Sequence, residues 1–115
     1  MITGAHVVIF SADAPADRAF LRDVVRLSSV DAGDGWLVFS LPPSELALHP
    51  ADEGAHELYL LTDDVASEVE TLRSRGATCS DIEQQSWGSL TRVRLPGGGD
   101  LGLYQPRHRT ASHEG

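Results

Sequence analysis

Two stretches of the chain share one pattern and divide the sequence into similar halves. The first, GAHVVIFSADAPADRAFLRDVVRL, begins at Gly4, and the second, GAHELYLLTDDVASEVETLRSRGA, begins at Gly54. Each runs from a GAH triplet through a short apolar segment and an Asp into an amphipathic helical pattern. The triplets are offset by 50 residues, whereas the apolar segment and the Asp are offset by 51. We prefer the second alignment, which pairs His6 with Glu57, because a strand and the helix cap after it must stay in phase.

Each repeat predicts one helix that packs on a core. The first helix begins near Asp13, a good N-cap residue, with Pro15 in its first turn. The second begins at Asp63 or Asp64 and ends before Gly76, a typical residue just after a helix. The core-facing stripes are Phe20, Val24 and Leu27 in the first helix and Val65, Val69 and Leu72 in the second.

Short strand-like segments follow each helix, and the turn sequences DAGDG, LPPS, SWG and PGGG separate them. The predicted strands are 28–30, 36–41 and 45–49 in the first half and 78–83, 89–95 and 100–105 in the second. Each half therefore reads as β-α-β-β-β, and the predicted fold class is α+β.

The length of 115 residues suits a single domain. Each half, 4–50 and 54–106, is small for an independent domain, so we expect the two halves to share one core within residues 1–110. The segment 107–115 reads as a polar tail, which we expect to be disordered.

Charge and cysteine content argue against several classes of protein. The chain carries 17 acidic and 9 basic residues, and scattered Arg at a net charge of −8 argues against nucleic-acid binding. One cysteine, Cys79, excludes an internal disulfide and a zinc finger and is compatible with a reducing cytoplasm, where we expect the protein. The first residues lack a signal-peptide pattern, and no run reaches the roughly 18 apolar residues of a membrane span, so we expect no membrane contact.

The doubled β-α-β-β-β pattern, ending in LPGGGDLGLYQPRH, resembles the vicinal oxygen chelate superfamily, which includes glyoxalase I, extradiol dioxygenases and bleomycin-resistance proteins. The resemblance covers residues 4–106. It implies two tandem βαβββ modules whose strands form an open, barrel-like mixed sheet, with helices outside and a cavity inside. It also implies a homodimer, because members of this superfamily commonly pair.

The resemblance also indicates where a metal ion would bind. Enzymes of the superfamily carry ligands on the first and last strand of each module, and these positions match His6, Ala47, Glu57 and Gly102. If the strand slips by one residue, His56 takes the place of Glu57. Since neither Ala47 nor Gly102 can bind a metal, we expect a degenerate site and no metal cofactor. A relocated divalent-metal site of His6, His49 and Glu57 is the alternative.

Strand alternation predicts which side chains share the cavity. With His6 pointing inward, Val8 and Phe10 point inward too, while Val7 and Ile9 lie under a helix. Trp36 and Trp87 follow turns, where aromatic rings stack on planar ligands or belong to a core or interface. Arg92 and Arg94 share one face, which is either solvated or an anchor for an acidic ligand. The predicted ligand-binding residues are His6, Trp36, His49, Glu57, Tyr59, Gly102 and Tyr104.

Three functions remain open on the sequence. The first is a metal-free protein that binds a small, partly aromatic organic molecule, and the acidic balance suits a cationic one. The second is an enzyme, either a metal-dependent lyase, isomerase or dioxygenase around His6, His49 and Glu57, or a metal-free enzyme with His6 and Glu57 as catalytic acid and base. The third is a scaffold without a small ligand, in which His6 is a hydrogen-bonded core residue.

Overall fold

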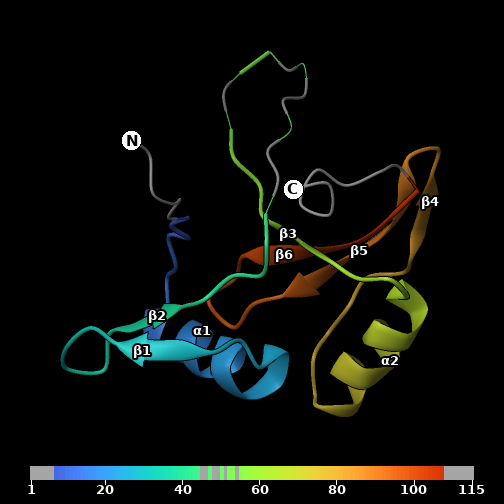
Figure 1. Ribbon diagram of the computed structural model, residues 1–115. Coiled ribbons are helices and arrows are strands. Elements are labelled where there is room, and N and C mark those ends of the chain that lie inside the picture. The colour runs from blue at the N-terminus through green and yellow to red at the C-terminus, as the bar shows by residue number, and fades with distance from the viewer. Residues whose placement is uncertain (1–6, 45–46, 48–49, 51, 54, 108–115) are drawn as a thin grey trace.

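The computed structural model describes residues 7–44, 47, 50, 52–53 and 55–107. They form an α+β fold with two separate sheets, and neither sheet closes into a barrel (Figure 1). The first half supplies a helical segment and a two-stranded sheet, and the second half supplies a helix and a four-stranded sheet. The predicted α+β class is therefore confirmed, whereas the two tandem βαβββ modules and their barrel-like sheet stay predictions.

The second half has the element order that its sequence predicts. Its elements are β3 (Tyr59–Leu61), α2 (Val65–Ser74), β4 (Glu83–Gln85), β5 (Gly88–Arg94) and β6 (Asp100–Pro106). The strands are ordered β3-β6-β5-β4, with β3 and β6 parallel and the other pairs antiparallel. The first and last strands of this half, β3 and β6, therefore lie side by side, and β4, which follows α2, lies at the opposite edge of the sheet.

Local signals set the bounds of α2. Asp64 is its N-cap, and the side chain accepts a hydrogen bond from Ser67 N at 3.1 Å. Gly76 follows the C-cap with φ of 91°, a conformation that glycine adopts without strain. Between these ends Val65, Val69 and Leu72 are buried. The predicted stripe therefore forms one wall of the core.

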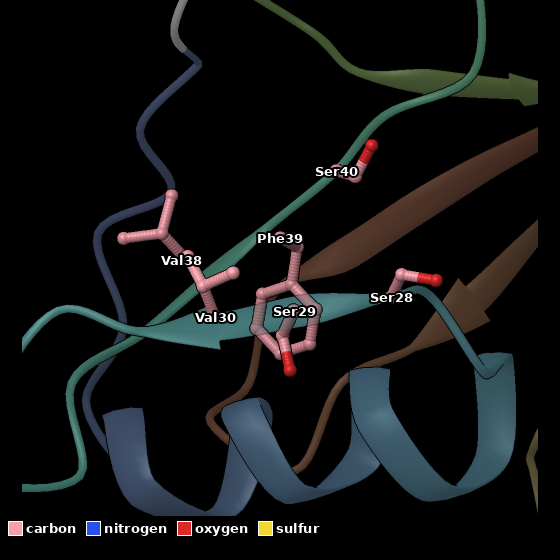
Figure 2. A pocket seen from close by; sticks show the side chains of 6 residues that line it. All are labelled: Ser28, Ser29, Val30, Val38, Phe39 and Ser40. Atoms are coloured by element: carbon pink, nitrogen blue, oxygen red, sulfur yellow. The ribbon is translucent and has the colours of Figure 1, made fainter.

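The first half begins with α1 (Ala14–Phe20), which continues as a π-helical turn, η1 (Leu21–Val25). Asp13 caps α1 by accepting a hydrogen bond from Ala16 N at 3.2 Å, as predicted. The strands β1 (Ser29–Asp31) and β2 (Leu37–Phe39) then form an antiparallel pair. Figure 2 shows the helical segment running beneath this pair.

Residues 7–10 depart from the prediction. They lie in no strand, and all four side chains are exposed, Phe10 by 94%. The inward positions expected for Val8 and Phe10, and the covered positions expected for Val7 and Ile9, are therefore wrong. A strand needs a neighbour to pair its backbone groups. In the second half that neighbour is the last strand, and its counterpart at 45–49 lies, except for Ala47, outside the described residues.

The main core belongs to the second half, and the first half packs against it. Its buried members are Val65, Val69, Leu72, Ala77, Cys79, Val93, Leu95, Leu101 and Leu103. Apolar side chains of α1 and η1 pack on this cluster. Two hydrogen bonds between described residues also join the halves. Asp17, itself buried, accepts from Gly97 N at 2.7 Å, and Arg75 donates from Nη1 to Val24 O at 2.8 Å.

Among the described helices, none has the length and apolar character needed to cross a membrane.

Candidate functional site

Three residues form one row across the four-stranded sheet, on the face opposite α2. Gly102 in β6 is paired with Tyr59 in β3 on one side and with Arg92 in β5 on the other. Its neighbours Leu101 and Leu103 point to the opposite face, into the core. The row therefore has a side chain at each end and none in the middle.

The ring of Tyr59 occupies the space that a side chain on Gly102 would need. A Cβ atom on Gly102 would collide with the ring, and it would lie 2.6 Å from Cε1 of Tyr59. The ring thus lies over the backbone of the neighbouring strand. This contact gives a physical reason for a glycine in the middle of a strand.

A chain of hydrogen bonds links the polar ends of the row. Arg92 donates from Nη2 to the Tyr59 hydroxyl at 3.2 Å, and that hydroxyl donates to Glu57 Oε2 at 2.5 Å. The same Arg92 nitrogen lies 3.8 Å from Glu57 Oε2. Burial, and next the hydrogen bond to Glu57, raise the pKa of the Tyr59 phenol. The hydrogen bond to Tyr59 raises the pKa of the Arg92 guanidinium, which therefore stays charged.

Aromatic side chains continue the site along the sheet. The rings of Tyr59 and Tyr104 meet edge to face with centroids 6.2 Å apart, and those of Tyr104 and Trp87 do so at 5.1 Å. Tyr104 also donates its hydroxyl to Trp87 O at 3.0 Å. Tyr104 is buried, whereas Trp87 is 43% exposed. Tyr59 and Trp87 therefore offer aromatic surface, and Tyr104 holds them in place.

The structure brings together four of the residues that the sequence selected: Glu57, Tyr59, Gly102 and Tyr104. The hydrogen bond from Tyr59 places Glu57 on this face, whereas Leu58 packs against the core. Two other predicted residues, His6 and His49, lie outside the described residues.

Trp36 lies apart from this group. It is in the turn between β1 and β2, which is remote from β4 and β5 in Figure 1. Its ring contacts the Arg18 guanidinium, which lies 4.5 Å from the ring centroid. Among the described residues, Trp36 makes no ring–ring or cation–π contact with the Tyr59 row.

Sequence reasoning left Arg92 and Trp87 out of the site. Alternation along β5 placed Arg92 on one face of its strand, but only the pairing of β5 with β6 shows that this face carries Gly102. For Trp87 the signal was the SWG turn, which the structure places next to Tyr104.

Two hollows stand out among the described residues. Tyr59 lines neither of them, and Gly102 lines the second. One of about 300 Å³ lies on the β1–β2 pair and is lined by Ser28, Ser29, Val30, Val38, Phe39 and Ser40 (Figure 2). The other, of about 200 Å³, lies between the two halves, with Leu27 of the first half and Leu60, Leu72 and Leu103 of the second among its lining residues.

The described residues do not fit the metal ion that the resembling enzymes hold. Gly102 has no side-chain ligand atom, and the Tyr59 ring fills the space in which one would lie. Glu57 lies next to the Arg92 guanidinium, whose positive charge opposes a second cation. Ala47 is exposed and carries no ligating group. Within the described part of the chain, no three His, Cys, Asp or Glu side chains gather closely enough to hold a metal.

Solved structures with the same fold cover nearly the whole chain. TnmS3, an antibiotic binding protein from Streptomyces sp. CB03234, is 22% identical with a TM-score of 0.65, and the match covers 92% of this chain and 99% of that one. A glyoxalase/bleomycin resistance protein/dioxygenase superfamily member from Sphaerobacter thermophilus is 20% identical with a TM-score of 0.66, covering 90% and 98%. Lactoylglutathione lyase from Agrobacterium tumefaciens is 16% identical with a TM-score of 0.65, covering 90% and 92%.

No protein-family model matches the sequence, and no curated protein matches it. The fold of the chain is nevertheless that of the glyoxalase/bleomycin resistance protein/dioxygenase superfamily. The resemblance to the vicinal oxygen chelate superfamily is thereby confirmed at the level of the fold. The similar structures include both a binding protein and an enzyme. The fold alone therefore does not determine the function, which must be inferred from the residues of the site.

Proposed function

We propose that this protein binds a small, partly aromatic organic molecule without a metal ion, on the sheet face that carries Tyr59 and Arg92. One observation carries this proposal. The ring of Tyr59 occupies the space that a side chain on Gly102 would need. The resemblance to the metal enzymes of the superfamily matches Gly102 to one of their ligand positions, so an aromatic and cationic surface would replace a metal ligand there.

The chemistry of this face suits a planar ligand. Tyr59 is half-buried, Trp87 is partly exposed, and the Arg92 guanidinium lies 5.6 Å from the centroid of the Tyr59 ring. Aromatic rings and guanidinium groups both stack on flat organic molecules. In this proposal Glu57 and Arg92 fix the orientation of the ligand, while His6 and His49 complete the binding site from the first half. Trp36, which contacts Arg18 in the turn between β1 and β2, is not part of it.

The proposal extends to the assembly. In the assembled protein, a cytoplasmic homodimer, residues 7–10 gain the strand partner that they lack in the single chain, so that the first half completes a second βαβββ module and the two modules build an open barrel. Exposed apolar side chains support this arrangement, because Val7, Val8, Ile9, Phe10 and Val30 would otherwise face water. A second copy of the chain would cover them.

Binding of 2-naphthamide, a neutral planar probe, tests the proposal by isothermal titration calorimetry. We expect saturable binding at one site per chain that EDTA treatment leaves unchanged and that Trp87→Leu weakens by about tenfold. Binding that requires added Mn²⁺ or Zn²⁺ would instead support a metal-dependent enzyme around His6, His49 and Glu57. The absence of binding under both conditions would favour a scaffold.

A further inference from the structure

We propose that the ligand of this face is an aromatic acid and that Arg92 selects it by binding its carboxylate. This inference rests on the binding function proposed above and adds the charge of the ligand. It differs from what the overall charge suggests, because a net charge of −8 by itself favours a cationic ligand.

Arg92 has hydrogen-bonding capacity to spare. A guanidinium carries five N–H donors in a planar fork that matches the two oxygens of a carboxylate. Among the described residues, Arg92 makes one side-chain hydrogen bond, from Nη2 to the Tyr59 hydroxyl. Its side chain is 41% exposed. The remaining donors can therefore reach a ligand on the open side of the sheet.

Contacts with Tyr59 restrict the position of the Arg92 guanidinium before any ligand binds. Because Gly102 has no side chain, the Tyr59 ring crosses the middle of the row and reaches the Arg92 side chain. The hydrogen bond to the Tyr59 hydroxyl and the contact with the ring face both restrict the guanidinium. A group positioned before binding loses less conformational entropy when the ligand arrives.

Glu57 is less suited to select a cation. Its Oε2 already accepts the hydrogen bond of the Tyr59 hydroxyl and lies 3.8 Å from the Arg92 guanidinium, so the two charges partly offset each other, whereas Arg92 keeps more unused hydrogen-bonding groups. Its side chain is also more exposed than that of Arg92, at 56%. Water and salt therefore screen Glu57 more strongly.

Arg94 provides a matched comparison on the same strand. It lies two residues after Arg92 and therefore on the same face, but it stands opposite Asp100 in the β5–β6 register. Arg94 is exposed and has no recorded contact with the Tyr59 ring among the described residues. A substitution there removes the same charge without touching the row.

The test compares three probes with one ring system: 2-naphthoate, 2-naphthamide and 2-naphthylmethylammonium. Dissociation constants are measured by calorimetry for the full chain and for Arg92→Gln, Arg92→Lys and Arg94→Gln. We expect the full chain to bind 2-naphthoate at least about tenfold more tightly than either other probe, as a charge-assisted pair allows. Arg92→Gln should abolish this preference, Arg92→Lys should retain part of it, and Arg94→Gln should retain it.

The outcomes separate this inference from the function on which it rests. If 2-naphthamide or the ammonium probe binds as tightly as 2-naphthoate, the ligand class is wrong while the binding function stands. Equal loss of the preference in Arg92→Gln and Arg94→Gln would show a general charge effect and overturn the role of Arg92. If no probe binds, both proposals fail. Circular dichroism of each variant identifies any that do not fold, and Arg92→Lys then carries the test.

Discussion

The ring of Tyr59 lies over Gly102, its partner across the β3–β6 pair, and leaves no room there for a side chain. This contact explains in terms of packing why a glycine stands at position 102 in GDLGLY. The family resemblance matches Gly102 to a metal-ligand position, and in the structure the ring of Tyr59 fills the side-chain space at this residue. Restoring a carboxylate at residue 102 would therefore also require removal of the ring.

The packing of these two residues predicts coupled effects on stability. Gly102→Ala should lower the free energy of unfolding by about 1–3 kcal/mol, because the added methyl group collides with the ring. In a Tyr59→Ala background the same change should cost less than about 0.5 kcal/mol. Urea denaturation of the four proteins in this double-mutant cycle measures the coupling. Equal costs in both backgrounds would show that the ring does not cause the requirement for glycine.

The PGGG turn offers a test of how the halves are joined. A Cβ on Gly97 would collide with Ser11 Oγ and lie 2.7 Å from Asp17 Oδ2, whereas a Cβ on Gly99 would meet only Leu95, at 3.9 Å. Gly97→Ala should therefore destabilise the protein by about 1–3 kcal/mol, and Gly99→Ala by less than about 0.5 kcal/mol. Thermal and urea unfolding of both variants checks this difference. Similar values for the two variants would argue against the docking of this turn on α1.

The environment of Tyr59 predicts a stability loss in alkali. Its pKa is raised by burial and then by Glu57, so the folded state holds the phenolic proton more tightly than the unfolded chain does. The contribution is fully present below the unfolded pKa of about 10 and is lost as the pH rises through the folded pKa. Urea unfolding at a series of alkaline pH values should show a smaller fall for Tyr59→Phe than for the unaltered chain. Identical slopes would contradict the shift.

The capping of α2 can be tested with adjacent residues. Asp64→Ala removes the acceptor for Ser67 N and should cost about 1 kcal/mol of unfolding free energy. Asp63→Ala, one residue earlier and exposed, is the control and should be nearly neutral. Urea denaturation compares the two. A larger cost at Asp63 would place the start of the helix one residue earlier.

Much of the second half could be predicted because its signals are local. The cap at Asp64, the stripe from Val65 to Leu72 and the alternation around Gly102 depend on residues close in sequence. The apolar run from Val7 to Phe10 carries an equally good strand signal, yet the structure has no strand there. Strand formation depends on a partner far along the chain, and a local pattern cannot supply one.

The candidate site also contains residues that the sequence could predict and one, Arg92, whose role it could not. The family resemblance selected Glu57 and Gly102, alternation within their strands added Tyr59 and Tyr104, and the structure brings the four together. The role of Arg92 depends on the register between β5 and β6, which places it in line with Gly102 and Tyr59. That register is a property of the folded sheet. The sequence alone therefore could not decide whether Arg92 faces solvent or anchors an acidic ligand.

Metal-free binding at the Tyr59–Gly102 position is tested most directly by native mass spectrometry combined with elemental analysis of freshly purified protein, before any chelator is added. We predict a dimer without stoichiometric divalent metal, in which any additional mass belongs to an organic molecule. Stoichiometric Mn, Fe, Ni or Zn that is lost in both His6→Ala and Glu57→Gln would contradict this prediction and assign the site to a metal-dependent enzyme.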